Sequence, residues 1–260
     1  MPDAGLPLPA FHEWPVPAAW QAIDFISDLH LSPALPRTYD AFARHLLQNT
    51  GADAVFLLGD IFEVWIGDDA MSQPFEGHCA DLLADAASRR PLAFMAGNRD
   101  FLLGGAMLAA TGLGGLPDPT VLDACGQRVL LTHGDALCLA DTDYQAFRRN
   151  VRSLHWQTEF LSRPLAERAR IAADIRSQSQ ERRAGAMAEG DIDRAEAVRW
   201  MHAMGTPEMV HGHTHRPGSE VLAPGYKRHV LSDWDLDDAA HPRAEVLRLT
   251  RGGFQRIAVA

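Results

Sequence analysis

Five short clusters of carboxylate, histidine and amide side chains are the residues of this sequence most able to do chemistry. They offer oxygen and imidazole nitrogen donors without a thiolate, which is a donor set that suits manganese, iron or zinc in hydrolytic sites. Four of the clusters contain a glycine, which lets the backbone turn sharply and approach a phosphate closely. The clusters are Asp28-Leu29-His30, Gly59-Asp60, Gly97-Asn98-Arg99-Asp100, His133-Gly134-Asp135 and His211-Gly212-His213-Thr214-His215.

Among these donors, Asp60 has the chemistry to join two cations. A carboxylate between two ions holds them about 4 Å apart, the separation that two-metal hydrolysis of a phosphate ester uses. Asp28 and His30 can reach one ion together if the chain bends at the end of its strand. A single cluster of this kind is more often a helix cap or a solvated surface group. Five of them in one chain favour a metal-dependent phosphoester hydrolase.

The clusters follow strand-like segments, and this arrangement is what would bring them together. Apolar runs end in four of the clusters, and helical patterns separate the first three runs. Thr38 is expected to cap the first helix. Ligands of an open α/β sheet bind beyond the carboxyl ends of its strands, so the clusters should converge there. The expected strands are 22–27, 54–59, 92–97 and 128–132, and the second helix is expected at 79–88.

After His133 the pattern becomes helical, and strands return only near the end of the chain. Helices are expected at 141–154, 164–183 and 191–204, and strands at 209–211, 226–231 and 244–259, with a hairpin turn at Gly252-Gly253. We therefore expect a loosely ordered N-terminal extension over 1–20, a core formed by 21–140 and 206–260, and a helical cap insertion over 141–205.

Composition limits the partners that this chain can have. Its formal net charge of −10 argues against a nucleic-acid partner, although residues 148–199 hold eleven Arg against eight acidic residues. That local surplus suits an anionic ligand or a membrane surface. The three cysteines are far apart in the sequence, which predicts a reducing cytosol rather than a disulfide frame. The sequence shows neither a signal peptide nor a membrane-spanning stretch.

Taken together, the clusters resemble the pattern of the calcineurin-like metallophosphoesterases, which is D-x-H, GD, GN, H and GHxH. The resemblance covers roughly Ile23 to Trp234 and rests on the strings SDLHL, GDIFEVWIGDD, GNRDFLLG, HGDALC, YQAFR and HGHTHRP. It implies a four-layer α/β/β/α metallophosphoesterase sandwich with a helical cap insertion.

The same resemblance implies two manganese ions and their ligands. One ion would be held by Asp28, His30, Asp60 and His215, and the other by Asp60, Asn98, His133 and His213. Many relatives have a histidine where this chain has Arg99. An arginine is no acid at neutral pH, but its guanidinium can fork onto phosphate oxygens. Arg99, Asp60 and His213 are therefore the expected catalytic residues, with Asp100 and Asp135 expected to orient Asn98 or His133.

Within the family, the strings are most similar to the branch that hydrolyses the pyrophosphate of UDP-2,3-diacylglucosamine in lipid A biosynthesis. This implies attack of water on the α-phosphorus, giving UMP and the diacylated sugar phosphate, with the cap covering the acyl chains. The implied substrate contacts are Asn98, Arg99, Asp141, Ser179 and His213. The family commonly places an Asn and a Lys after that serine, and here Arg183 is the available substitute for the missing cation.

The implied substrate is embedded in a membrane, so we expect a cytoplasmic protein held peripherally at the inner membrane, with no obligate protein partner. Two alternatives stay open. One is a general nucleotide phosphodiesterase or pyrophosphatase of the same fold, against which Arg99 and the long apolar cap argue. The other is a non-catalytic metal-binding scaffold, against which the complete set of seven ligands argues.

Overall fold

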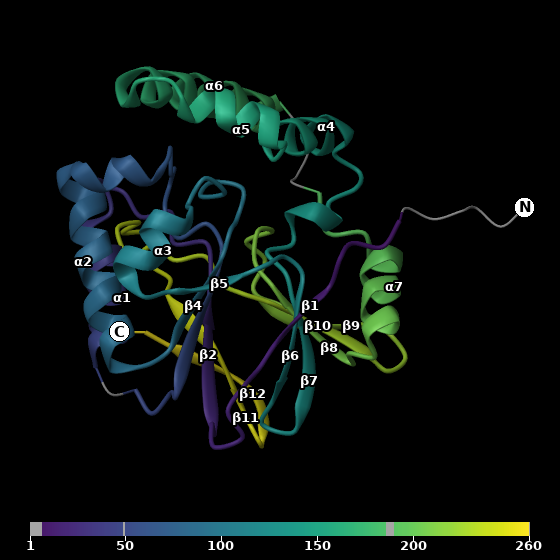
Figure 1. Cartoon of the computed structure of the whole chain (residues 1–260). Helices are drawn as coiled ribbons and strands as arrows, with labels where there is room; N and C mark the ends of the chain where they lie inside the picture. Colours follow the sequence, from purple (N-terminus) through teal and green to yellow (C-terminus); the bar gives the residue numbers. More distant parts are fainter. Residues whose placement is uncertain (1–6, 49, 186–189, 260) are drawn as a thin grey trace, which may run out of the picture.

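Two six-stranded sheets face each other in the computed structural model, which describes residues 7–48, 50–185 and 190–259 (Figure 1). The first sheet runs in the order β12-β11-β2-β3-β4-β5 and the second in the order β1-β6-β7-β8-β10-β9. The strands of the first sheet are β2 (Ala22–Ile26), β3 (Ala54–Leu58), β4 (Leu92–Met95), β5 (Gly114–Leu116), β11 (Glu245–Thr250) and β12 (Gly253–Ala258). Those of the second are β1 (His12–Trp14), β6 (Thr120–Ala124), β7 (Gln127–Leu131), β8 (Glu208–His211), β9 (Gly218–Ala223) and β10 (Tyr226–Val230).

The inner faces of the sheets form one hydrophobic core. Phe25 and Phe56 of the first sheet pack with Leu131 and Val210 of the second, and all four are at most 1% exposed. Strands β2 to β5 pair in parallel, so their carboxyl ends lie at one edge. Strands β7 and β8 pair in parallel as well. The ends of both sets of strands supply the polar clusters.

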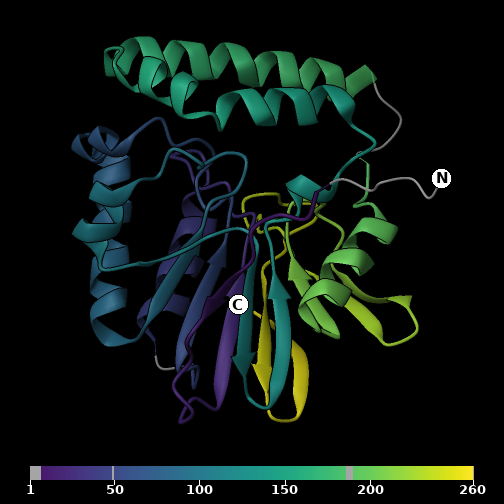
Figure 2. The same ribbon diagram turned by 45° about the vertical axis from the view of Figure 1, so that its right-hand side comes forward.

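Helices cover the outer face of each sheet. On the first sheet lie α1 (Pro36–Leu47), α2 (Pro74–Arg89) and α3 (Gly105–Thr111), and on the second lies α7 (Arg194–Met204) (Figure 2). Trp200 and Met201 of α7 are buried in a cluster with Val121 and Met209 of the second sheet. The result is an α/β/β/α sandwich, as the resemblance implies.

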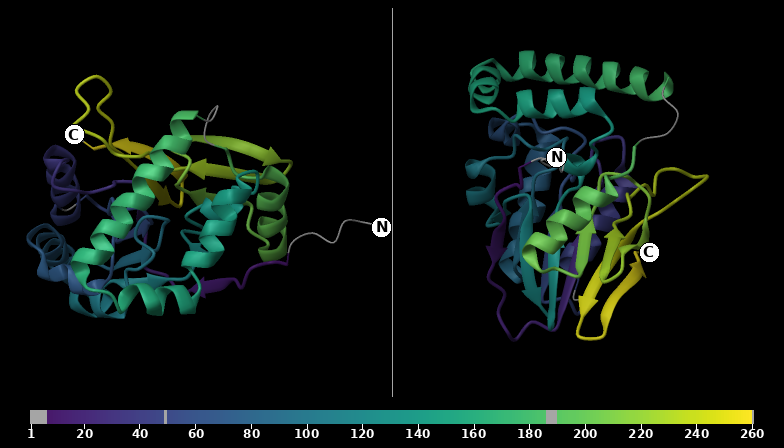
Figure 3. Two further views of the ribbon diagram at one scale, coloured as in Figure 1. Left: turned by 90° about the horizontal axis from the view of Figure 1, so that it is seen from above. Right: turned by 90° about the vertical axis from the view of Figure 1, so that its right-hand side faces the viewer.

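Three further helices lie over one edge of the sandwich. They are α4 (Thr142–Val151), α5 (Leu154–Leu161) and α6 (Leu165–Gly185), and seen from above they extend across it (Figure 3). Two short 3₁₀ helices, η1 (Asp68–Ser72) and η2 (Asp135–Leu137), lie in the loops below. We call α4, α5 and α6 the cap. None of the helices in the described ranges is long and apolar enough to cross a membrane.

Four expectations need correction. Thr38 does not cap α1, which begins at Pro36; its hydroxyl instead donates to Asp237 at 2.8 Å. The N-terminal extension is not wholly loose, because β1 pairs with β6. Helix α5 was not predicted as a separate helix. Helix α7 packs on the second sheet rather than with the cap, so the division of the chain into core and cap remains a proposal.

Candidate metal centre

The expected ligands stand out first by their backbone conformation. Asp28, His30, Asp60, His213 and His215 all have positive φ, between 50° and 65°. Cys125 is the one other non-glycine residue of the described chain with this property. A left-handed residue costs on the order of 1–3 kcal/mol, and such residues gather at functional sites. The bend expected between the strand end and Asp28-x-His30 is therefore real, and the strain points to a function at these positions.

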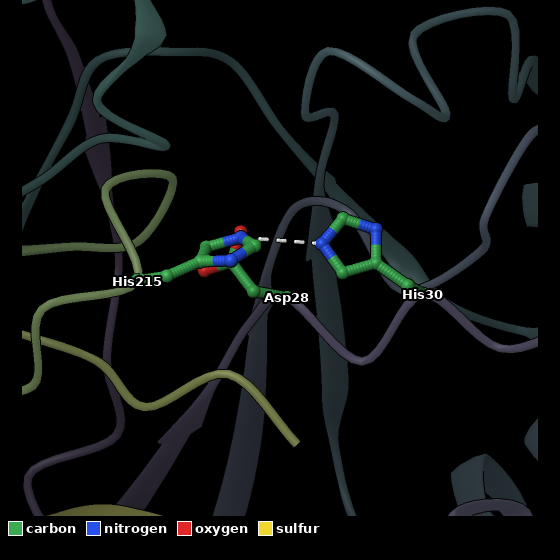
Figure 4. Close-up of side chains that lie close together, drawn as sticks. All are labelled: Asp28, His30 and His215. Carbon is green, nitrogen blue, oxygen red and sulfur yellow. Dashed lines mark hydrogen bonds and ion pairs between the residues drawn. The ribbon is translucent and has the colours of Figure 1, made fainter. Parts of the chain in front are cut away.

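Three of these side chains form what we call the open cluster, consisting of Asp28, His30 and His215. Nε2 of His30 lies 3.2 Å from Nε2 of His215, which in turn lies 3.4 Å from Oδ1 of Asp28 (Figure 4). One ligand atom from each residue lies within 4.8 Å of the others. The imidazoles are partly accessible, with side-chain exposures of 17% for His30 and 30% for His215.

A second group, the buried cluster, consists of Asp60, His133 and His213, whose ligand atoms also lie within 4.8 Å of one another. The Asn98 amide oxygen lies between the two imidazoles, 3.0 Å from Nε2 of His133 and 2.8 Å from Nδ1 of His213. His133 is fully buried, and its Nδ1 lies 2.9 Å from the carbonyl of Leu58. A proton on Nδ1 would donate to that carbonyl and leave Nε2 free to bind a cation.

Glycine makes this close approach possible at two positions. A Cβ added to Gly97 would overlap the carboxylate of Asp60, and one added to Gly212 would overlap the carboxylate of Asp28. Neither position has room for any side chain. The glycines of these clusters thus let two loops pack directly against the carboxylates, which fixes where the oxygens point.

Burial sets the protonation of several groups at the centre. Burial raises the pKa of Asp60 to about 7, despite the opposing effect of His133. Burial lowers the pKa of both His30 and His213 to about 3, so these imidazoles are neutral at pH 7 and have a free lone pair. Neutral imidazoles offer a lone pair to a cation, and a bound cation would favour the ionised form of Asp60.

Asp28 and His133 are held in their charged forms. Burial opposes ionisation of Asp28, but the hydrogen bond from His215 and the charge of His133 hold its pKa well below the usual range. Burial likewise opposes protonation of His133, yet the neighbouring carboxylates of Asp60 and Asp28 raise its pKa to about 9. His133 therefore acts as the internal counter-ion, and a bound metal ion would replace its proton.

The residues present fit divalent cations. Carboxylate oxygens, imidazoles and one amide oxygen converge in two groups, which is the donor chemistry of a hydrolytic metal centre. The two groups follow the division that the resemblance implies, and Asn98 lies with the buried cluster. Asp60 belongs to the buried cluster, and its second role as a bridge to an ion in the open cluster remains a prediction.

Two further carboxylates hold the loops around the centre, in different ways. Asp100 accepts hydrogen bonds from the backbone N–H groups of Gly97 and Ile61, each at 2.8 Å, so it joins the loops that present Asn98 and Asp60. It acts on the backbone rather than on the side chain of Asn98. This is the kind of outer support that ligands of a metal site usually require.

Asp135 does not orient His133 by a hydrogen bond, contrary to expectation. Its buried carboxylate accepts from the Tyr144 hydroxyl at 2.7 Å and from Arg148 Nε at 2.8 Å, and Arg152 lies 3.4 Å away. Arg152 also donates to the carbonyl of Gly97 at 2.9 Å. Asp135 therefore attaches α4 of the cap to the core beside the metal centre.

Tyr144 is a residue of the centre that the sequence did not predict to lie beside the metal ligands. Its ring stacks on His213 with 5.9 Å between the centroids. Burial and the charge of Asp135 raise its pKa well above the usual value, so its hydroxyl stays protonated and donates. The only signal for it was its place in the YQAFR string.

The expected substrate contacts are placed unevenly. The backbone N–H of Arg99 donates to Oδ1 of Asp60 at 2.8 Å, and its guanidinium lies 3.6 Å from Glu63. Asp141 is exposed and caps α4 by accepting from the N–H of Tyr144 at 2.9 Å. Ser179 and Arg183 lie in α6 outside the part whose side chains are described.

An α/β/β/α sandwich with two carboxylate and histidine clusters at its strand ends defines a metallohydrolase. The chain belongs to the calcineurin-like phosphoesterase family, whose model matches residues 22–217. Membership implies that the chain binds divalent metal ions. It also confirms the family resemblance and the fold class that the sequence suggested.

Curated relatives match nearly the whole chain. A UDP-2,3-diacylglucosamine hydrolase of Ralstonia nicotianae is 45% identical over 88% of this chain and 89% of the relative. One of the same name from Xanthomonas axonopodis pv. citri is 43% identical, covering 88% of this chain and 95% of the relative. A solved archaeal phosphodiesterase aligns at a TM-score of 0.45 and 11% identity, covering 91% of this chain and 99% of the other, a likeness too weak to bear on function.

Proposed function

We propose that this protein hydrolyses UDP-2,3-diacylglucosamine in lipid A biosynthesis, releasing UMP and 2,3-diacylglucosamine 1-phosphate. The observation that carries the proposal is the identity of 42–45% to hydrolases named for this substrate, over 88% of the chain. The complete set of ligand side chains and the cap above them support it. A non-catalytic scaffold would have no need to keep five strained ligand residues.

Two Mn²⁺ ions per chain are the proposed cofactors. Bound there, they would supply Lewis acidity that lowers the pKa of a water and draws electron density from the phosphorus. The proposed ligands are Asp28, His30 and His215 for one ion, and Asn98, His133 and His213 for the other. In this proposal, the carboxylate of Asp60 belongs to both.

The chain's own residues would bind and orient the pyrophosphate. Arg99 lies beside Asp60, so its guanidinium can fork onto the phosphate oxygens and offset the charge that develops there. Its side chain is 17% exposed, which leaves part of it accessible to a substrate. We further propose that Asn98 and His213 contact the scissile phosphate, that Asp141 and Ser179 contact the substrate from the cap, and that Arg183 supplies a cation there.

The leaving group, 2,3-diacylglucosamine 1-phosphate, needs no strong acid. It departs as a phosphate monoester, which is already a stable anion, so Arg99 is chemically adequate where many relatives have histidine. His213, held by the ring of Tyr144 and the amide of Asn98, then serves to fix the phosphate rather than to protonate it. This assigns catalytic roles to Arg99, Asp60 and His213.

Acyl chains would lie against the cap. Trp156 and Phe160 of α5 stack with 4.6 Å between ring centroids, and Phe101 of the core lies 6.1 Å from Trp156. Leu154 and Leu161 on the same helix are 81% and 41% exposed. Exposed leucines beside basic side chains support peripheral attachment at the cytoplasmic face of the inner membrane.

Hydrolysis in ¹⁸O-labelled water with added Mn²⁺ tests the proposed reaction. We expect the label in UMP, because water would attack the α-phosphorus, and mass spectrometry of both products would show it. Label in the sugar phosphate would place the attack at the other phosphorus. Protein that cleaves bis-p-nitrophenyl phosphate but leaves the diacylated substrate intact would instead be a general phosphodiesterase.

A further inference from the structure

Glu63 is a carboxylate at the rim of the metal centre whose role the site described above leaves open. Its side chain is 15% exposed and lies among three nitrogen groups from three parts of the chain. Nδ1 of His30 lies 3.6 Å from one oxygen, and Arg99 and Arg176 lie 3.6 Å and 3.1 Å from the other. Arg176 belongs to the cap helix α6, so Glu63 is where the open cluster, Arg99 and the cap meet.

The backbone holds Glu63 in this place. Its N–H donates to the carbonyl of Leu31 at 3.1 Å, and the N–H of Leu31 donates to Ile61 at 2.9 Å. The N–H of Trp65 donates to the carbonyl of Arg99 at 3.0 Å. The segment that carries Glu63 is thereby bonded to the loops of both His30 and Arg99, which fixes the backbone positions of the three residues relative to one another.

The geometry of His30 supplies the second observation. Its Nε2 faces His215, and its Nδ1 is buried with no hydrogen-bond partner among the described residues. A neutral imidazole that binds a cation through Nε2 has its proton on Nδ1, and a buried N–H needs an acceptor. The carboxylate of Glu63 is the acceptor nearest to hand, and a small rotation of either side chain would complete the bond.

We propose that Glu63 is a positioning residue that holds His30 in the orientation the open cluster needs, and that the same carboxylate aligns Arg99 and attaches α6 through Arg176. The first half rests on the metal binding that family membership implies. The second half rests on the proposed function. Attachment of the cap and the geometry of the open cluster thus depend on one side chain.

A simpler role for Glu63 would be an ion pair with Arg176 alone. Arg176 is 44% exposed, and pairs of that kind contribute little to stability. Such a pair would have no effect on metal affinity. Metal binding is therefore the measurement that separates the two roles, and it does not depend on the identity of the substrate.

Titration of the metal-free protein with Mn²⁺ by calorimetry tests the first half. We expect Glu63→Gln to weaken one of two binding steps by about 10- to 100-fold, the usual effect of removing the carboxylate behind a ligating histidine. Asp69→Asn is the matched control, because it removes a different ion pair with the cap, to Arg168, at a carboxylate that does not contact His30. It should leave both steps unchanged.

Glu63→Ala guards against compensation by the amide oxygen of glutamine and should weaken the same step at least as much. Circular dichroism and thermal unfolding of each metal-free variant would establish that it is folded. If either variant failed to fold, the other would carry the test. Folded Glu63→Gln and Glu63→Ala proteins with unchanged Mn²⁺ affinity would overturn the proposal.

Steady-state kinetics tests the second half. We expect Arg176→Gln to raise KM for the diacylated substrate without changing Mn²⁺ affinity, whereas Glu63→Gln raises KM and lowers kcat at subsaturating Mn²⁺. With bis-p-nitrophenyl phosphate, which has no acyl chains, Arg176→Gln should have no effect and Glu63→Gln should still lower the rate. An equal effect of Arg176→Gln on both substrates would contradict the proposed role of Glu63 in attaching the cap. It would leave the proposed role in orienting His30 unaffected, because the metal titration tests that role separately.

Discussion

The open and the buried clusters differ in what holds their histidines. In the buried cluster, His133 is fully buried, with Nδ1 2.9 Å from the carbonyl of Leu58 and Nε2 3.0 Å from the amide oxygen of Asn98. In the open cluster, His30 and His215 are partly exposed, and Nδ1 of His30 depends on Glu63. The buried cluster is therefore formed by the fold itself, while the open cluster depends on rim residues. We expect the cation of the open cluster to exchange more readily.

Asp60→Asn should have the largest effect, because Asp60 is the one ligand assigned to both ions. The amide loses the negative charge that a bridge between two cations needs. We expect activity to fall by more than the roughly 100-fold that removing an outer partner of a ligand can cause. The rate of bis-p-nitrophenyl phosphate cleavage at saturating Mn²⁺ measures the loss of activity. Activity near that of the wild type would contradict the bridging role of Asp60.

The same substitution should stabilise the metal-free protein. The pKa of Asp60 rises from 3.8 to about 7 on folding, so between these values the folded carboxyl holds a proton that the unfolded chain has released. Raising the pH through this window therefore destabilises the wild type relative to Asp60→Asn. Urea unfolding in a chelator at pH 5 and pH 7.5 should show the variant's advantage growing with pH, and an advantage that shrinks would contradict this.

Arg99 should rank next, because its proposed contact is with the phosphate rather than with the cations. Removing a group that stabilises developing charge costs about 10²- to 10³-fold in kcat. We expect Arg99→Ala to lose about that much and Arg99→Lys, which keeps the charge but not the fork, to lose less. Calorimetric titration should find Mn²⁺ affinity unchanged in both variants. Loss of a binding step would instead show that Arg99 contributes to metal binding.

Asp135→Asn tests how the cap is attached beside the buried cluster. Burial opposes the charge of Asp135, but Arg152 and Arg148 hold its pKa well below the usual range, so its contribution is present at pH 7 and lost as the pH falls below about 4. Breaking a fully buried pair costs about 3–5 kcal/mol, and these arginines are about one fifth exposed, so we expect a smaller loss. Urea unfolding at pH 7 measures it, and an unchanged midpoint would contradict the account.

The smallest effect on the fold should come from Leu154→Ser on the cap. Leu154 is 81% exposed, and surface substitutions usually change stability by no more than about 0.5 kcal/mol. Binding to vesicles that contain phosphatidylglycerol should nonetheless fall, because the substitution removes apolar area from the proposed membrane surface. A flotation assay compares the vesicle binding of the variant and the wild type. Equal binding would show that Leu154 of α5 is not part of the membrane-binding surface.

Sequence predicted the parts of the centre that follow from strand ends. Asp28, Asp60 and Asn98 each follow a parallel strand within three residues of its end. Parallel strands end at one edge, so their meeting could be inferred from order alone. The helices α1 and α2 were equally accessible, because their apolar spacing is periodic. These predictions were possible because they need only local sequence patterns and one rule of sheet topology.

Contacts between distant loops could not be inferred in the same way. Nothing in the sequence says that Asp135 turns to α4 rather than to His133, or that Glu63 meets Arg176, because a carboxylate can pair with any cation that the fold brings near. Helix α7 was predicted to belong to the cap for a related reason. Trp200 and Met201 form an apolar face that could pack against either the cap or a sheet. Strand β1 was missed because three residues among prolines carry too little pattern.

Anomalous diffraction from crystals grown with Mn²⁺ would test the central claim most directly. We predict two peaks about 3.5–4 Å apart, one at Asp28, His30 and His215 and the other at Asn98, His133 and His213, with the Asp60 carboxylate between them. A single peak, or a pair of peaks with Asp60 touching only one, would contradict the account.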